Sequence, residues 1–261
     1  MKRLEGRRAI VTGGGSGIGR HSAIRFAREG ASVLVVGRAA NTEETVDLIR
    51  AEGGSALAMV ADASIEANVE AMVRRCIADL GGLEVLFANI GATGTNTPLL
   101  EQTVEEWAEV YRINTISSFL AIKYAGRHMT AQRRGSIILN SSAASLRANA
   151  GAISYSAAKA AVNSLTQCAA NAFAGTGVRV NAVLPGLIET QLTRKVFEDA
   201  RARGVESRIG HVTPLKRAGQ PEEIAALVAF LASDDASYID GQCIAADGGV
   251  SSTHPYGRIA L

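Results

Sequence analysis

Near its amino terminus the chain reads Thr12-Gly13-Gly14-Gly15-Ser16-Gly17-Ile18-Gly19, directly after the apolar run Ala9-Ile10-Val11. Glycines let the backbone turn sharply and bring its N–H groups against a ligand, at a cost in conformational entropy. The helical pattern that follows places a helix amino terminus, with about half a positive charge, beside this loop. The stretch predicts a pyrophosphate-binding loop rather than a plain strand-to-helix turn. It lacks Gly-Lys-Ser/Thr, which argues against a nucleoside-triphosphate P-loop.

Short β-rich runs alternate with helix-length segments along the rest of the chain. Further strands are expected at 32–36, 56–60, 83–88, 136–139, 178–184 and 242–245, and helices at 17–29, 42–52, 66–80, 104–130, 153–174 and 221–232. The strand runs are apolar on both faces, as in parallel strands that helices cover on both sides. We therefore predict an α/β fold, a Rossmann-type doubly wound parallel sheet of about seven strands with helices on both faces.

The chain has 261 residues, 47% of them apolar, which is enough for one sizeable core. No linker, repeat or low-complexity stretch divides it, so we expect a single dinucleotide-binding and catalytic domain over 1–261. The longest stretch without a strand, 186–220, is the candidate for a mobile substrate lid over the carboxyl ends of the strands. The tail after Val250 is expected to pack near a neighbouring subunit's site.

Composition excludes several classes of function. A formal net charge of +2 does not predict binding to nucleic acid or to an anionic membrane. The apolar run 224–232 is far shorter than the roughly 20 residues of a membrane span. The three cysteines are far apart and the histidines are scattered, so neither a metal site nor a disulfide framework is indicated. Charged residues follow Met1 where a signal peptide needs its apolar run. We expect a cytoplasmic protein.

Residues after the second, third and fourth strands indicate which dinucleotide binds. Dinucleotide folds place an acidic residue after the second strand for the adenosine ribose, or an arginine for a 2′-phosphate. Arg38 stands there, and a planar guanidinium suits a phosphate, so we predict NADP(H) in preference to NAD(H). The alternative is an exposed loop arginine. Asp62 is expected either to accept a hydrogen bond from the adenine amino group or to cap the next helix, and Asn89 to brace the loop over the cofactor.

Tyr155 and Lys159 form Y-x-x-x-K within an expected helix, where this spacing puts both side chains on one face. A tyrosine titrates near 10 and needs a shift of roughly 2–3 pKa units to act as an acid or base near neutrality. A nearby ammonium and a positive nicotinamide would both favour the phenolate. Ser142, at the end of the strand run Ile137-Ile138-Leu139, is expected to point into the crevice where such sheets bind ligands.

With these residues in place, the sequence resembles the short-chain dehydrogenase/reductase family, in its single-domain NAD(P)-dependent branch, over about residues 5–250. The shared motifs are the cofactor loop Thr12-Gly13-xxx-Gly17-Ile18-Gly19, the turn Asn89-Ile90-Gly91, the set Asn114, Ser142, Tyr155 and Lys159, the stretch Pro185-Gly186-xxx-Thr190, and the closing turn Asp247-Gly248-Gly249. In one departure, Ser16 stands where NADP-using relatives often carry Lys or Arg, so the NADP(H) prediction depends mainly on Arg38.

The resemblance implies that Tyr155 is the general acid/base and that Ser142 binds the reacting oxygen. It also implies that Lys159 lowers the tyrosine pKa and holds the nicotinamide ribose, and that Asn114 holds a water linked to Lys159. The alternative for Asn114 is an ordinary buried polar residue. With the loop residues above, the expected cofactor contacts are Gly13, Gly15, Ser16, Gly17, Ile18, Gly19, Arg38, Asp62, Ala63, Asn89, Gly91, Tyr155, Lys159, Pro185, Gly186, Ile188 and Thr190.

The function implied is hydride transfer between NADP(H) and a small ketone or secondary alcohol. Within it, a 3-oxoacyl-thioester (acyl-carrier-protein) reductase and a reductase of sugars, cyclic ketones or steroids stay open. A non-catalytic dinucleotide sensor is the alternative from another class. Basic residues in 190–217 indicate either capture of an anionic substrate or a solvated amphipathic helix. The segment Tyr155–Phe173 has Lys159 as its only charge, so we expect burial against another subunit in a homotetramer.

Overall fold

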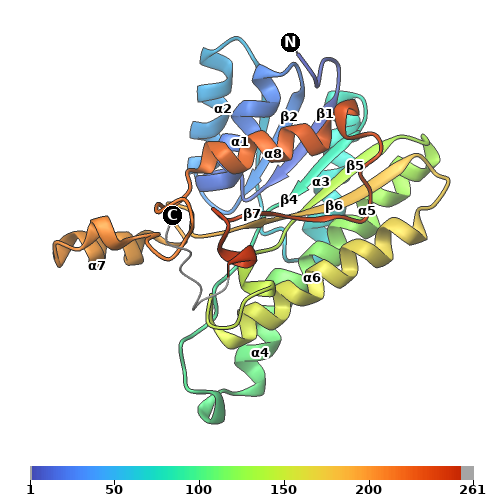
Figure 1. Cartoon of the computed structure of the whole chain (residues 1–261). Helices are drawn as coiled ribbons and strands as arrows, with labels where there is room; N and C mark the ends of the chain where they lie inside the picture. Colours follow the sequence, from blue (N-terminus) through green and yellow to red (C-terminus); the bar gives the residue numbers. More distant parts are fainter. Residues whose placement is uncertain (1, 254–261) are drawn as a thin grey trace.

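The computed structural model describes residues 2–253, and its centre is a seven-stranded parallel sheet, as predicted (Figure 1). The strands are β1 (Arg8–Thr12), β2 (Ser32–Gly37), β3 (Ser55–Val60), β4 (Val85–Ala88), β5 (Gly135–Asn140), β6 (Val178–Pro185) and β7 (Cys243–Ala246), in the order β3-β2-β1-β4-β5-β6-β7. Successive strands are added toward one side of the sheet up to β3 and toward the other side from β4 onward. This change of strand order between β1 and β4 makes a crevice at their carboxyl ends. Part of the tail that we expected near a neighbouring subunit, 254–261, lies outside the described residues.

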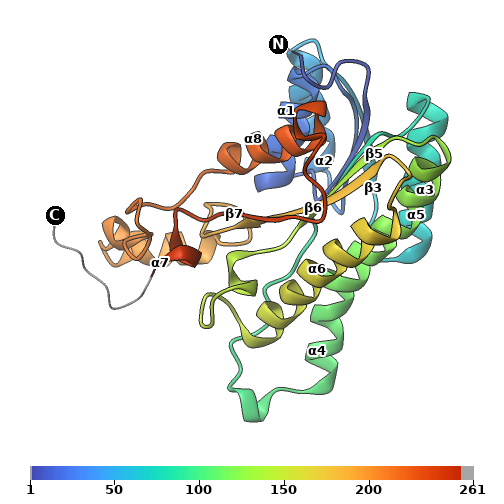
Figure 2. The ribbon, with the colours of Figure 1, turned by 45° about the vertical axis from the view of Figure 1, so that its right-hand side comes forward.

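Helices cover both faces of this sheet (Figures 1 and 2). They are α1 (Gly17–Arg28), α2 (Asn41–Ala51), α3 (Glu66–Leu80), α4 (Val104–Tyr111), α5 (Ser117–Ala131), α6 (Ile153–Ala172), α7 (Arg194–Ala202) and α8 (Pro221–Ala232). Two apolar clusters form the core, one between the sheet and α3, α5 and α6, and the other between the sheet and α1, α2 and α8. This explains the strands' two-sided apolar pattern, since each strand packs against helices on both faces.

The single helix expected at 104–130 is wrong in one respect. The structure divides it into α4 and α5 by a π-helical turn at Arg112–Ile116, and α5 continues to Ala131. Amphipathic periodicity runs through such a turn almost unchanged, because the π turn adds only one residue to the helical ladder. The turn carries the buried Asn114, whose side chain donates to the carbonyl oxygens of Val110 and Ala92.

The segment 186–220 contains no strand of the sheet, as expected. It forms α7, a short 3-10 helix at Glu206–Arg208, and one isolated bridge between Ile188 and Gly219. The figures show α7 reaching out beyond the sheet on a side different from α4 (Figure 1). The segment begins directly after the carboxyl end of β6. Because the sheet is parallel, this is the same end of the strands at which the glycine-rich loop follows β1.

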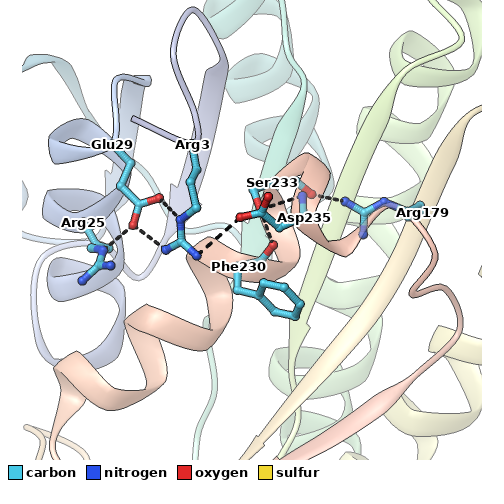
Figure 3. Close-up of polar contacts among 7 residues, drawn as sticks. All are labelled: Arg3, Arg25, Glu29, Arg179, Phe230, Ser233 and Asp235. Carbon is cyan, nitrogen blue, oxygen red and sulfur yellow. Dashed lines mark hydrogen bonds and ion pairs between the residues drawn. The ribbon is translucent and has the colours of Figure 1, made fainter. Parts of the chain in front are cut away.

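At the other end of the molecule, away from the carboxyl ends of the strands, ion pairs and hydrogen bonds to backbone carbonyl oxygens connect several elements (Figure 3). Arg3 forms a two-pronged contact with Glu29 at the end of α1, at 2.7 Å for each pair of atoms, and Arg25 also donates to Glu29. Arg179 at the start of β6 donates to the carbonyl oxygens of Leu231 and Ser233 at 2.9 and 3.0 Å. These contacts join the chain start, α1, β6 and the end of α8 far from the carboxyl ends of the strands.

Within the described part of the chain, no helix has both the length and the apolar character needed to cross a bilayer. Over the same residues, 2–253, no group of three His, Cys, Asp or Glu side chains is placed to hold a metal ion. Cys76, Cys168 and Cys243 are free thiols.

Candidate active site

A cavity of about 430 Å³ opens at the carboxyl ends of the central strands. Most of the predicted cofactor contacts line it: Gly13, Gly15, Ser16, Gly17, Ile18, Arg38, Asp62, Ala63, Asn89, Gly91, Tyr155, Lys159 and Thr190. Loop, strand ends and α6 therefore meet at one site, although they are up to 177 positions apart between Gly13 and Thr190. Gly19, Pro185, Gly186, Ile188, Asn114 and Ser142 do not line this cavity.

The glycine-rich loop has a shape that only glycine allows at two positions. Gly13 has φ +63°, in the left-handed region. A Cβ on Gly19 would lie 2.1 Å from the carbonyl oxygen of Gly13, so this glycine lets α1 pack against the loop and supports the site from behind. Ser16 precedes α1 in an extended conformation, and its side chain makes no capping hydrogen bond. The first N–H groups of α1 and the Ser16 hydroxyl are thus available to an anion, which fits a pyrophosphate.

Asn89 braces this loop, as the sequence predicted. Its backbone N–H donates to the Thr12 hydroxyl at 2.9 Å, and its Nδ2 donates to the carbonyl oxygens of Thr12 and Gly13 at 3.2 and 3.5 Å. Because β4 lies beside β1 in the sheet, the end of one strand holds the loop that leaves the other.

One end of the cavity carries Arg38 and Asp62. Arg38 is exposed and makes no side-chain hydrogen bond or ion pair with other residues in 2–253, which leaves its guanidinium available. Asp62 accepts from the backbone N–H and the hydroxyl of Ser64 at 2.9 and 2.6 Å, so it holds the turn that leads into α3. Arg112 reaches the same turn from the π-helical segment and donates to the Ser64 hydroxyl at 2.5 Å. Burial raises the pKa of Asp62, but the Ser64 hydrogen bonds, together with the nearby charges of Arg38 and Arg112, outweigh it and hold the pKa below its usual range.

The other end of the cavity carries Tyr155 and Lys159, one turn apart on α6. The Lys159 Nζ lies 5.7 Å from the centre of the Tyr155 ring and donates to the backbone carbonyl oxygen of Asn140 at 2.6 Å. Ser142 follows β5, its hydroxyl lies near enough to the Tyr155 phenol to lower the pKa of that group, and its Oγ accepts from the Ala144 N–H at 3.1 Å. The three side chains therefore converge at the end of β5.

The surroundings that the chain itself gives Tyr155 do not favour the phenolate. Burial raises the pKa of the phenol, and the Ser142 hydroxyl offsets only part of this effect. Burial also lowers the pKa of Lys159 to about 7, so the amine is not fully charged near neutrality. Helical spacing correctly predicted that the two groups share a face, but it carried no information on the cost of removing both from water.

Asn114 and Gly91 complete this end of the site. The Asn114 Oδ1 accepts from the Ala92 N–H at 3.3 Å, and a Cβ on Gly91 would lie 2.9 Å from this oxygen and 3.4 Å from the Lys159 Nζ. The absence of a side chain at Gly91 thus brings Asn114 and Lys159 close together. All of the Asn114 contacts that we find are to backbone atoms, which also fits the alternative of a buried structural residue.

The other predicted residues lie close by. Gly186 packs against Asp247, whose carboxylate accepts from the N–H groups of Gly249 and Ser251 in the closing turn. Ile188 is buried in the core, and Thr190 packs against Gly17 of the glycine-rich loop. Sequence reasoning missed several residues of the cavity wall: Val36, Gly37, Ala39, Asn41, Ala61, Ser64, Ile90, Ile113, Asn140, Gln191 and Leu192. Two of them carried a visible signal: Ile90 stands inside the turn Asn89-Ile90-Gly91, and the polar strand-end residue Asn140 directly precedes Ser141 and Ser142 in an otherwise apolar strand.

Comparison with known proteins agrees with this geometry. A family model described as "Enoyl-(Acyl carrier protein) reductase" matches residues 13–251. The cis-4-hydroxycyclohexanecarboxylate dehydrogenase of Sinomonas cyclohexanicum is 39% identical over 244 residues, covering 94% of this chain and 96% of that protein. The 3-oxoacyl-acyl-carrier-protein reductase FabG of Thermotoga maritima is 37% identical over 252 residues, covering 95% and 99%. A structure from Beutenbergia cavernae, assigned as a NAD(P)-dependent gluconate 5-dehydrogenase and holding NADP at low occupancy, superimposes with a TM-score of 0.87 at 37% identity, covering 97% and 99%.

Fold, loop and relatives together define a dinucleotide-dependent oxidoreductase that transfers hydride. The chain belongs to the short-chain dehydrogenase/reductase family.

Proposed function

We propose that this protein transfers a hydride between NADP(H) and a carbonyl compound or secondary alcohol, with Tyr155 as the general acid/base. The observation that carries this proposal is that Tyr155 and Lys159 line the same cavity as the glycine-rich loop. A dinucleotide whose phosphates bind at the amino terminus of α1 would extend along this cavity to the reacting phenol.

In the proposed mechanism, the bound nicotinamide supplies or accepts the hydride. Tyr155 gives its phenolic proton to the substrate carbonyl oxygen, or removes the hydroxyl proton in the reverse direction. The Ser142 hydroxyl donates to the same oxygen and stabilises its developing negative charge. Lys159 stays near the phenol because its Nζ is held by the Asn140 carbonyl oxygen, and Asn114 would hold a water on the path from Lys159 to solvent.

Cofactor choice depends on Arg38 in this proposal. Its exposed guanidinium in the wall of the cavity suits a 2′-phosphate, which favours NADP(H) over NAD(H), and the related Beutenbergia structure holds NADP.

The substrate class is open within small ketones and alcohols. The named relatives include a dehydrogenase of a cyclic hydroxy acid and a reductase of acyl-carrier-linked 3-oxoacyl groups, so both classes are candidates. The proposed lid, 186–220, offers few free positive charges to an anionic substrate, because several of its basic residues already form ion pairs. Arg194 pairs with Glu198, Lys195 with Asp199, Arg201 with both Glu189 and Glu206, and Arg217 with Glu223. This pairing favours a solvated amphipathic segment.

Oxidation of NADPH, followed at 340 nm with a panel of cyclic, acyl-thioester and sugar ketones, tests the proposal. Tyr155→Phe should reduce kcat at least about a hundredfold while the affinity for NADPH is retained, since it removes only the transferable proton. Near-normal turnover in this variant would refute the role of Tyr155. Tight NADPH binding with no turnover on any ketone would favour a dinucleotide sensor.

We further propose a cytoplasmic homotetramer. Exposed positions along α6, including Ala160, Ser164 and Gln167, are uncharged, and neighbouring α5 exposes Phe119. Free thiols at all three cysteines suit a reducing compartment.

A further inference from the structure

Asn140, the last residue of β5, has contacts that the proposed mechanism leaves partly unused. It lies two residues before Ser142 and lines the same cavity as Tyr155 and Lys159. Its backbone carbonyl oxygen accepts from the Lys159 Nζ at 2.6 Å, and its side-chain Nδ2 donates to the Asn89 Oδ1 at 2.9 Å. It is thus connected both to the reacting end of the site and, through Asn89, to the glycine-rich loop.

The hydrogen-bond network determines which way the Asn140 amide faces. The Asn89 Nδ2 donates to the carbonyl oxygens of Thr12 and Gly13, so the Asn89 Oδ1 must face the other way, toward Asn140. An oxygen there requires a donor, and therefore the Asn140 Nδ2 points at Asn89. The Asn140 Oδ1 consequently lies on the opposite side of the amide.

That oxygen is buried and has no hydrogen-bond partner among residues 2–253. A buried amide oxygen without a donor is unfavourable, and unpaired groups of this kind in a folded protein often mark a place for a ligand or an ordered water. Because Asn140 belongs to the cavity wall, a ligand bound in the cavity could supply that donor.

We propose that the Asn140 Oδ1 accepts a hydrogen bond from the nicotinamide half of the dinucleotide, either from a ribose hydroxyl or from the carboxamide amino group. The inference rests on the proposed function, which places this half beside Tyr155 and Lys159. The pyrophosphate between the two halves offers only acceptors. The adenosine half is expected near Arg38 and Asp62, at the other end of the cavity. Asn140 is therefore a residue that positions the reacting end of the cofactor.

The test compares dissociation constants for NADP⁺ and for adenosine 2′,5′-bisphosphate, measured by calorimetry on the whole protein. Asn140→Leu keeps the approximate shape of the side chain and removes both polar atoms. We expect it to weaken NADP⁺ binding about three- to tenfold, the scale of one neutral hydrogen bond. Binding of the adenosine fragment should stay within twofold, because this fragment lacks the nicotinamide half and Asn89 keeps its own hydrogen bonds to Thr12 and Gly13.

Two matched variants separate this role from a structural one. Asn89→Leu should weaken both ligands, because Asn89 braces the loop that holds the phosphates. Asn163→Leu should weaken neither ligand. Asn163 also has a buried unpaired Oδ1, but it donates to Ser145 and lies outside the cavity wall. Should Asn140→Leu fail to fold, Asn140→Thr retains a hydroxyl donor for Asn89 on a side chain that favours strands, and the same selective loss is expected.

The outcomes are distinct. Unchanged NADP⁺ binding in both Asn140 variants, or an equal loss for NADP⁺ and the fragment, would overturn the inference and leave the proposed function standing. A wild-type protein that binds no dinucleotide would overturn the proposed function itself. When the inference holds, nicotinic acid adenine dinucleotide phosphate identifies the donor. This ligand has a carboxylate in place of the carboxamide but keeps the ribose hydroxyls. If the carboxamide is the donor, Asn140→Leu should not weaken its binding; if a ribose hydroxyl is the donor, Asn140→Leu should weaken it.

Discussion

At the scale of single residues, the burial of Lys159 makes protein stability depend on pH. Its pKa falls from 10.5 to about 7 in the folded protein, because the side chain is removed from water. Between these values the unfolded chain binds more protons than the folded one, so stability increases with pH. Burial of Lys159 therefore lowers the free energy of unfolding by its full amount below pH 7. This cost disappears as the pH rises toward 10.5.

Lys159→Met should accordingly stabilise the ligand-free protein most at pH 6, by at most roughly 5 kcal/mol, the equivalent of the pKa shift. Loss of the contact with the Asn140 carbonyl oxygen offsets part of this gain. Urea unfolding from pH 6 to pH 10 measures the difference, which should shrink as the pH rises. A difference that does not change with pH would show that Lys159 is not held in a low-pKa environment.

Arg38 is the residue on which cofactor preference should depend. Arg38→Asp replaces a group that suits the 2′-phosphate by one that repels it and can accept from the ribose hydroxyls of NAD(H). We expect kcat/KM with NADPH to fall at least about tenfold relative to that with NADH, since one charge-assisted contact is lost. Steady-state kinetics with both cofactors gives the ratio. A wild-type enzyme that already prefers NADH would contradict the assignment.

At the scale of elements, the amino terminus of α8 is held by a charged capping arrangement. The Glu223 carboxylate accepts from the Gln220 N–H at 2.8 Å and from both Nη atoms of Arg217 at 2.7 and 2.6 Å. These contacts lower the pKa of Glu223 to about 2, with the Arg217 hydrogen bond as the largest cause. Because this folded-state pKa lies below the ordinary 4.5, the stabilisation is complete above pH 4.5 and is lost as the pH falls toward 2.

Glu223→Gln should lower the free energy of unfolding by about 1 kcal/mol at pH 7, as for other helix caps, because the ion pair is largely exposed. The difference in free energy of unfolding should be smaller at pH 3, because much of the stabilisation from the low folded-state pKa of Glu223 is lost between pH 4.5 and pH 2. Denaturant unfolding at the two pH values measures it, with Glu43→Gln in the first turn of α2 as the control. An equal loss in the control would point to net charge rather than the cap.

The π-helical turn between α4 and α5 is a feature that the sequence did not predict. Periodicity predicted one continuous helix, and the motif match identified Asn114 without any account of its conformation. The turn places Arg112 against Ser64 at one end of the cavity and Asn114 against Ala92 near the other. A single irregular segment therefore contacts both ends of the site.

At the scale of the whole molecule, the uncharged exposed positions of α6 and the exposed Phe119 of α5 lead to a prediction about assembly. Ala160→Glu would place a charge on a face that we propose to be buried between subunits, and burying an unpaired charge is strongly unfavourable. We expect the variant to dissociate at concentrations where wild type is a tetramer, as measured by light scattering. A monomeric wild type at micromolar concentration would contradict the proposed homotetramer.

The sequence by itself determined the architecture and the catalytic candidates. Strand and helix periodicity and glycine placement are local signals, so the parallel sheet, the loop at β1 and the shared face of Tyr155 and Lys159 followed from short stretches of chain. Only the tertiary structure decided the electrostatics of the site and the neighbours of Asn140. Burial of Lys159, the raised pKa of Tyr155 and the unpaired Asn140 oxygen arise where β1, β4, β5 and α6 meet. Desolvation depends on everything packed around a group, and no local pattern encodes that.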